Sequence, residues 1–183
     1  TAHDDDARVV LHFGAVDYAA TVWVNGSQVA AHVGGHSPFS ADITDYLDGG
    51  DELVVVRAVD RPLDVGQPRG KQEWLPEPHE IWYSRTSGIW QPVWVEEVPA
   101  THVTELSWRT TRSTDSVVLE VLCNRPLGPD AVIDVQLSYA GSPLTRVQVA
   151  SPATGAPIID IPLRDQRNGQ HYEKLVWTPE TPR

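Results

Sequence analysis

The sequence predicts an all-β protein, and three observations support this fold class. First, 15 prolines and 13 glycines divide the 183 residues into short runs rich in β-branched residues, which is the pattern of strands joined by turns. Second, no segment repeats its apolar residues at the spacing of an amphipathic helix. Third, Asn25-Gly26 lies between two apolar-rich runs, and this dipeptide favours a two-residue hairpin turn, which needs positive φ at both central positions.

The first half of the chain contains several segments expected to be strands: Val9–Phe13, Thr21–Val24, Gln28–Ala31, Glu52–Asp60, Ile81–Tyr83 and Ile89–Val98. One of them is apolar on both faces at its centre, Leu53–Val56, which predicts a strand inside a sandwich. Asp42–Leu47 is expected to form one helical turn, with Asp42 or Thr44 as its cap.

Arg61–Glu80 differs from the rest of this half. The segment contains Pro62, Pro68, Pro76 and Pro78 among charged residues and shows no apolar periodicity. A non-periodic segment of this length is uncommon in a compact domain and is often functional. It is therefore the candidate binding loop of the chain.

The second half begins at a junction, Pro99–Thr101. The expected strands beyond it are Val103–Arg109, Val117–Asn124, Ala131–Tyr139, Leu144–Val149 and Ile158–Leu163. Their even spacing, with turn signals between them, predicts a small immunoglobulin-like β-sandwich. We therefore expect two domains, residues 1–98 and 99–183.

The composition argues against several kinds of partner. The formal net charge is −11, from 14 basic and 25 acidic residues, which argues against nucleic acid because phosphates are bound by clusters of Lys and Arg. No apolar run approaches the roughly 18 residues needed to span a membrane, so we expect no membrane partner. Cys123 is the only cysteine, so no disulfide can form within the chain. This favours a reducing, cytoplasmic compartment.

The carboxylates of the candidate loop do not form a recognisable catalytic pair. Glycoside hydrolysis typically uses two positioned carboxylates. Glu73, Glu77 and Glu80 have the spacing of one helical face, but Pro76 and Pro78 make that helix improbable. We therefore expect no catalytic residue in this chain.

The histidines do not indicate a metal site. His32 and His36 are four residues apart, but Gly34-Gly35 lies between them and disfavours a helix. A zinc site would also need further ligands. We expect neither a metal nor a cofactor.

Tryptophan is unusually frequent, with seven copies: Trp23, Trp74, Trp82, Trp90, Trp94, Trp108 and Trp177. Trp90 and Trp94 share one face of an expected strand, which predicts a core or interface position. Trp74 and Trp82 lie in or beside the candidate loop and are the ones expected to face a ligand, because indole rings suit the C–H faces of sugars.

Two motifs together resemble a known family. One is Val22–Gly26 followed by Gly34–Thr44, and the other is Trp82–Glu96, which contains Ser-Gly-Ile-Trp-Gln-Pro-Val-Trp-Val-Glu. A third segment, Val176–Pro182, is similar to a Trp-Ser-Pro-x-x-Pro segment late in the family's second domain. In order and spacing, the chain resembles the N-terminal part of the family 2 glycoside hydrolases, which include β-galactosidases, β-glucuronidases and β-mannosidases.

The resemblance implies a fold and a context for the chain. The fold is a jelly-roll, galactose-binding-like β-sandwich followed by an immunoglobulin-like β-sandwich. The chain is then the non-catalytic accessory portion of a retaining β-O-glycosidase, whose two glutamates lie in a downstream TIM barrel absent here. The implied partners are a carbohydrate, bound through the parent active site, and that missing barrel.

The resemblance also implies that strands are missing at both ends, before Val9 and after Pro182. A sheet edge left open by that loss would be adhesive. We therefore expect the isolated chain to be marginally stable or to associate with itself as a homo-oligomer.

The resemblance also implies which residues form the site. In the family, a loop just before the Ser-Gly-Ile segment extends to the rim of the active site. Several relatives carry a substrate-contacting Asp about five residues before that Ser, and the matching position here is Trp82. The rim contacts that the resemblance implies are Glu80, Trp82, Tyr83 and Arg85, with Lys71 and Gln72 behind them and Trp74 beside them.

Two other functions stay open at this level. A free-standing carbohydrate-binding module would need complete domains, whereas the resemblance implies that this chain lacks strands at both ends. An adhesion β-sandwich module is equally consistent with the acidic surface and the density of turns.

Overall fold

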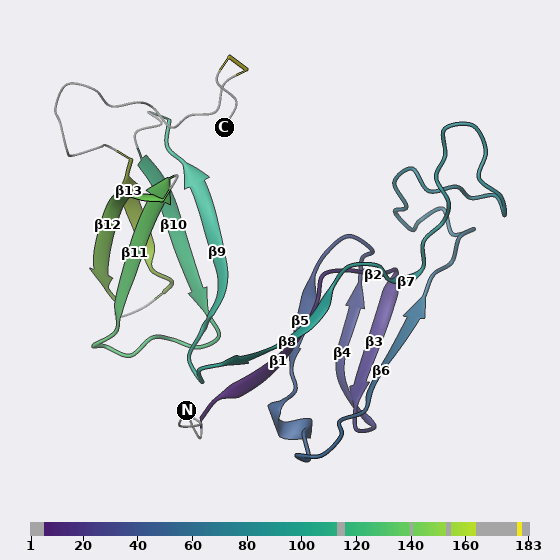
Figure 1. The fold of residues 1–183 in the computed structure, drawn as a ribbon, viewed down its shortest axis with the longest axis horizontal. Helices are drawn as coiled ribbons and strands as arrows, with labels where there is room; N and C mark the ends of the chain where they lie inside the picture. The colour runs from purple at the N-terminus through teal and green to yellow at the C-terminus, as the bar shows by residue number, and fades with distance from the viewer. Residues whose placement is uncertain (1–5, 113–115, 140, 153–154, 164–178, 181–183) are drawn as a thin grey trace. The chain divides into compact units, whose positions relative to one another are not determined.

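The computed structural model describes residues 6–112, 116–139, 141–152, 155–163 and 179–180 (Figure 1). The chain divides into two compact units, Thr1–Ala100 and Thr101–Arg183. The strands confirm the predicted all-β class, and the helical element among the described residues is a single 3-10 turn, η1 (Thr44–Tyr46). In this described part, no helix has the length and apolar character needed to cross a membrane.

Among its described residues, the first unit contains two three-stranded antiparallel sheets and one short two-stranded sheet. In one sheet, β1 (Arg8–Phe13) lies between β5 (Phe39–Asp42) and β8 (Val93–Val98). In the other, β3 (Ala19–Val24) lies between β4 (Ser27–Val33) and β6 (Val54–Val59). The short sheet joins β2 (Val16–Asp17) to β7 (Gly88–Ile89).

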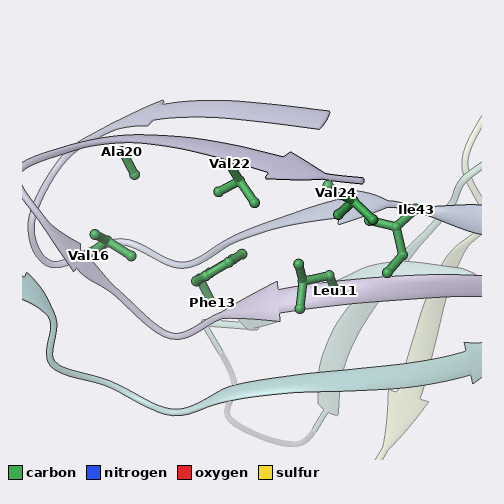
Figure 2. Close-up of a cluster of buried hydrophobic side chains, with 8 residues drawn as sticks. Leu11, Phe13, Val16, Ala20, Val22, Val24 and Ile43 are labelled. Atoms are coloured by element: carbon green, nitrogen blue, oxygen red, sulfur yellow. The ribbon is translucent and has the colours of Figure 1, made fainter. Parts of the chain in front are cut away.

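The core of this unit is a cluster of aliphatic and aromatic side chains from β1, β3 and the segments beside them (Figure 2). Ala20, Val22 and Val24 are buried in β3, whereas Thr21 and Trp23 between them are half-buried. This alternation follows from the two-residue period of a strand, which sends successive side chains to opposite faces. The cluster comprises Leu11, Phe13, Val16, Ala20, Val22, Val24, Ala41 and Ile43.

The predicted hairpin between β3 and β4 is confirmed. Asn25 has φ 48° and Gly26 has φ 83°, the positive values that a primed two-residue turn requires. The Asn25 side chain also makes long-range contacts, because its Oδ1 accepts a hydrogen bond from the Leu53 amide at 2.9 Å and its Nδ2 donates to the Tyr46 carbonyl at 2.9 Å. Asn25 therefore joins the hairpin to the segments that precede β6.

The predicted helical turn is present, but the predicted cap is wrong. The N-cap position is occupied by Ile43, which has no capping side chain. Asp42 instead accepts hydrogen bonds from the Thr44 amide at 3.1 Å and from Arg8 Nε at 2.8 Å. Partial burial by itself raises the pKa of Asp42, but the hydrogen bonds from Arg8 and Thr44 outweigh it and hold the pKa below its usual value.

The segment Leu53–Val56 was predicted to lie inside a sandwich, but among the described residues most of it is exposed. Its β6 portion pairs with β3 on one side only, as the edge of its sheet. Leu53 is 64% exposed and Val55 is 47% exposed. The apolar run was correctly placed in a strand, but burial depends on which strands lie beside it, and that is not a local property.

The region Ile81–Val98 also departs from the prediction. Ile81–Tyr83 forms no strand, and Tyr83 makes only an isolated bridge with Gln72. Ile89–Val98 is interrupted at residues 90–92, where Pro92 has no amide to donate to a ladder. Trp90 and Trp94 therefore do not share a continuous strand, and they are 42% and 41% exposed rather than in the core.

The second unit has its own sheets and core. In the larger sheet β10 (Ser116–Cys123) lies between β9 (Val103–Thr110) and β13 (Ile158–Pro162), and β11 (Val132–Tyr139) pairs with β12 (Ser142–Ala150). Leu119, Val121, Ile159 and Ile161 form the buried cluster. The five expected strands are present, and their immunoglobulin-like arrangement stays a prediction. The Val176–Pro182 motif lies outside the described residues except for Pro179 and Glu180.

Phe13→Ala should strongly destabilise the first unit. Phe13 is 1% exposed and stacks on Phe39 with ring centroids 4.7 Å apart. Removing a buried aromatic ring leaves a cavity and typically costs about 3–5 kcal/mol of unfolding free energy. Urea unfolding followed by tryptophan fluorescence measures the change. Val33→Ala on β4 is the control, because Val33 is 66% exposed; equal effects of the two changes would contradict the assignment of the core.

Candidate functional site

The long loop, residues 61–87, leaves the end of β6 and returns to β7 (Figure 1). Apart from the isolated bridge between Gln72 and Tyr83, it forms no ladder of its own. Buried backbone and polar groups in such a segment need partners from side chains. Three carboxylates, those of Asp17, Asp60 and Glu73, supply several of these partners.

Asp17 lies at the end of β2 and is only 2% exposed. Its Oδ2 accepts a hydrogen bond from Gln72 Nε2 at 3.2 Å and lies 3.2 Å from the hydroxyl of Thr86. Gln72 Oε1 in turn accepts the Thr86 amide at 2.7 Å. Asp17 therefore connects the outgoing and the returning arms of the loop.

Asp60 follows β6 directly and makes a second connection of the same kind. Its Oδ1 accepts a hydrogen bond from Gln67 Nε2, and its Oδ2 accepts one from the Ser87 hydroxyl. Gln67 is 9% exposed, and its Oε1 accepts the Arg61 amide at 3.2 Å. The first turn of the loop is thus tied both to the end of β6 and to the start of β7.

Arg69 also has a structural task within the loop. Its guanidinium donates hydrogen bonds to the carbonyl oxygens of Pro62 and Asp64, the latter at 2.9 Å. These bonds satisfy backbone acceptors that lack a ladder partner. Arg69 therefore holds the turn that follows Arg61.

Glu73 is the most enclosed side chain of the loop, at 1% exposure. Its Oε1 accepts the amides of Trp74 at 2.8 Å and Leu75 at 3.1 Å, and its Oε2 accepts the amide and the ring Nδ1 of His79. Burial by itself raises the pKa of Glu73, but these hydrogen bonds to the charged form outweigh it, so the pKa lies below its usual value. Glu73 is a structural anion rather than a proton donor.

An aromatic group lies on the same part of the loop. The Trp74 and Trp82 rings meet edge to face with centroids 5.1 Å apart, and Trp74 also contacts His79 at 6.2 Å. Because Glu73 fixes both the Trp74 amide and His79, the inner bonds of the loop hold this aromatic group in place.

The structure distributes the predicted site residues between two sides of the loop. Lys71, Trp74, Glu80, Tyr83 and Arg85 are exposed, and Trp82 is half-buried. Gln72 is half-buried as well, but its amide is committed to Asp17 and Thr86 inside the loop. Trp82 and Trp74 are brought together, and Tyr83 is joined to both neighbours of Gln72 through backbone hydrogen bonds.

The residues that shape the loop from within were not identified from the sequence. They are Asp17, Asp60, Thr86 and Ser87, together with the inward roles of Gln67 and Glu73. The sequence signal that was available is the run of two hydroxyl residues, Thr86-Ser87, directly before a strand. Their partners lie far away in the sequence, so this signal alone could not pair them.

The outer surface suits binding better than catalysis. A cavity of about 280 Å³ lies beside Trp74 and is lined by Pro62, Leu63, Val65 and Arg69. Within the described residues, no group of three or more His, Cys, Asp or Glu side chains is placed to hold a metal ion. The enclosed carboxylates already accept hydrogen bonds from the protein, so the loop offers a shaped aromatic and polar surface.

Comparison with known proteins identifies the family of the chain. The model of the glycosyl hydrolases family 2, sugar binding domain, matches residues 2–99. The chain belongs to this family. The matched segment contains the whole long loop of this family 2 chain.

Similarity to individual glycosidases agrees with the family match. The chain is 33% identical to the β-galactosidase of Thermoanaerobacter pseudethanolicus over 111 residues, which is 60% of this chain and 14% of that protein. It is 30% identical over 106 residues to a putative β-glucuronidase of Formosa agariphila, covering 58% of this chain and 12% of that protein. The chain therefore corresponds to a small part of the curated relatives it matches.

A solved structure shows the same fold over most of the chain. The crystal structure of a putative β-galactosidase from Bacteroides fragilis aligns with a TM-score of 0.59 and 21% sequence identity. The alignment covers 87% of this family 2 chain and 25% of the other chain. At this identity the likeness concerns the fold alone.

Glu73→Gln should loosen the long loop in a pH-dependent way. The folded-state pKa of Glu73 lies below the ordinary value of 4.5, so its contribution to stability is fully present above the unfolded pKa and is lost as the pH falls through the folded pKa. The variant should therefore speed hydrogen exchange of the Trp74 and Leu75 amides at pH 7, and the difference from wild type should shrink below about pH 4.5.

The matched control for this change is Glu77→Gln. Glu77 belongs to the same loop but is exposed, so the same loss of charge should leave the exchange of these amides close to that of wild type. An equal effect of Glu77→Gln, or a Glu73→Gln effect that persists unchanged at acid pH, would contradict the anchoring role of the Glu73 charge.

Proposed function

We propose that this chain is the non-catalytic accessory portion of a family 2 glycosidase. In this proposal the parent protein hydrolyses β-O-glycosidic bonds by a retaining mechanism, with two glutamates in a TIM barrel that is not part of these 183 residues. A retaining site needs two carboxyl groups about 5–5.5 Å apart. The observation that carries the proposal is the match of residues 2–99 to the family's sugar binding domain.

We infer that the outer side of the long loop contributes to the rim of the parent active site. Trp74, Trp82 and Tyr83 offer aromatic surface for the C–H faces of a sugar ring or its aglycone. Lys71 and Arg85 offer hydrogen-bond donors and Glu80 offers an acceptor for hydroxyl groups. Gln72 supports this surface from inside the loop, through its bonds to Asp17 and Thr86.

The domain assignment belongs to the same proposal. Residues 1–98 are assigned to a jelly-roll sandwich that carries the loop, and residues 99–183 to an immunoglobulin-like sandwich. A free-standing carbohydrate-binding or adhesion module has less support, because the named relatives are glycosidases of which the matched segment is only 12–14%.

Trp82→Ala in the full-length parent should lower kcat/KM by about 5- to 30-fold, or roughly 1–2 kcal/mol of transition-state binding. The ring would be lost from the rim and from its contact with Trp74. Steady-state hydrolysis of p-nitrophenyl β-D-galactoside and β-D-glucuronide measures the effect.

Trp108→Ala provides the control for this change. Trp108 is 48% exposed and lies on β9 of the second unit, so its removal should leave kcat/KM nearly unchanged. Unchanged kinetics of Trp82→Ala, with the protein folded, would remove Trp82 from the proposed rim.

A further inference from the structure

Two aspartates at strand ends hold the long loop through the same pattern of hydrogen bonds. Asp17 ends β2 and Asp60 follows β6. Each carboxylate bonds one glutamine of the outgoing arm and one hydroxyl of the returning arm. Asp17 takes Gln72 and Thr86, whereas Asp60 takes Gln67 and Ser87. We call these two groups the Asp17 clamp and the Asp60 clamp.

The Asp17 carboxylate packs against the Gly35 backbone as well as against the long loop. A Cβ added to Gly35 would lie 2.6 Å from Asp17 Oδ1, closer than real Cβ atoms approach, so the glycine backbone passes directly against the carboxylate. The Gly35 carbonyl in turn accepts a hydrogen bond from Trp90 Nε1 at 2.7 Å. The 2% exposed Asp17 carboxylate is therefore confined between this backbone and the loop.

Gln72 links the Asp17 clamp to the outer surface of the loop. The residues on either side of it bond the same partner, because the Tyr83 amide donates to the Lys71 carbonyl at 3.0 Å and the Glu73 amide donates to the Tyr83 carbonyl at 2.8 Å. A displacement of Gln72 would consequently move Lys71 and Tyr83 together. Trp82 precedes Tyr83 and would move with it.

We propose that Asp17 and Asp60 are positioning residues of the glycosidase proposed above. Asp17 sets the place of Lys71, Trp82 and Tyr83 through Gln72 and Thr86. Asp60 fixes the first turn of the same loop through Gln67 and Ser87, and neither aspartate touches the substrate. The inference rests on the proposed function for its kinetic consequence, whereas the clamps themselves are a property of the described loop.

The decisive variant is Gln72→Glu in the full-length parent. At neutral pH it places a second carboxylate against Asp17, and two carboxylates at hydrogen-bond distance repel and raise the pKa of one of them. Once protonated, the new side chain donates a hydrogen bond to Asp17 and restores the clamp.

The other ionisable groups in this region are Asp60, Arg69, Glu73 and Arg85, which line one small cavity with Gln72.

We expect kcat/KM of Gln72→Glu, relative to wild type at the same pH, to fall on the order of tenfold at pH 7.5, since a displacement of about 1 Å can cost more than this. The ratio should recover to within about threefold at pH 5 as the new carboxyl takes up a proton. Hydrolysis of p-nitrophenyl β-D-galactoside or β-D-glucuronide is the kinetic readout. Hydrogen exchange of the Glu73 and Tyr83 amides, which is independent of activity, should be faster at pH 7.5 and should recover in parallel.

Two further variants keep the test decisive. Thr86→Val retains the shape of Thr86 but removes its hydroxyl, and should lower kcat/KM by a factor that does not change with pH. Gln28→Glu, on the exposed part of β4, adds the same charge away from any clamp and should match wild type. If Gln72→Glu behaved like Gln28→Glu in both readouts, the positioning role would be wrong.

The outcomes also separate this inference from the proposed function. A parent that hydrolyses none of the p-nitrophenyl β-D-galactoside, β-D-glucuronide and β-D-mannoside would overturn the proposed function, whereas a Trp82→Ala variant with wild-type kinetics would overturn only the rim assignment. Accelerated and pH-reversible exchange in Gln72→Glu would still support the clamp. Normal exchange together with reduced kcat/KM would overturn the clamp and leave the glycosidase proposal standing.

Discussion

The path of the long loop depends on carboxylates that are buried and that accept hydrogen bonds from the protein. Asp17 and Glu73 are almost completely enclosed, and an enclosed charge that loses its partners is costly because several kcal/mol of hydration are no longer recovered. The donors that serve these carboxylates are therefore held in place. Because those donors belong to the long loop, a segment with almost no ladder of its own acquires a defined path.

Local signals predicted those parts of the fold that local chemistry controls. Asn25-Gly26 predicted the hairpin because positive φ is a property of those two residues. The strands around Phe13 and Val22 were predicted because alternation and β-branching are readable in a short window. The cap was misjudged because the turn begins at Thr44 and Ile43 takes the N-cap position, whereas Asp42 lies one residue before it and bonds both the Thr44 amide and the distant Arg8.

Burial and site geometry could not be read in the same way. Val54 and Val55 are of a residue type common in cores, yet they lie exposed on β6, the edge strand of its sheet. Trp74 and Trp82 were identified because tryptophan in a polar loop is conspicuous. Asp17 was not identified, because its partners Gln72 and Thr86 are 55 and 69 positions away, and no window of the sequence connects them.

The loop has an inner set of side chains that holds its backbone in place and an outer set that faces solvent. Protein engineers who wish to move a binding surface from one scaffold to another usually fail at the supporting contacts. Here the supports can be named: two aspartates at strand ends, two glutamines, two adjacent hydroxyls, the enclosed Glu73 and the guanidinium of Arg69. A graft of this loop into another sandwich would need aspartates at the recipient positions that correspond to Asp17 and Asp60. The residues of the outer set could then be redesigned freely.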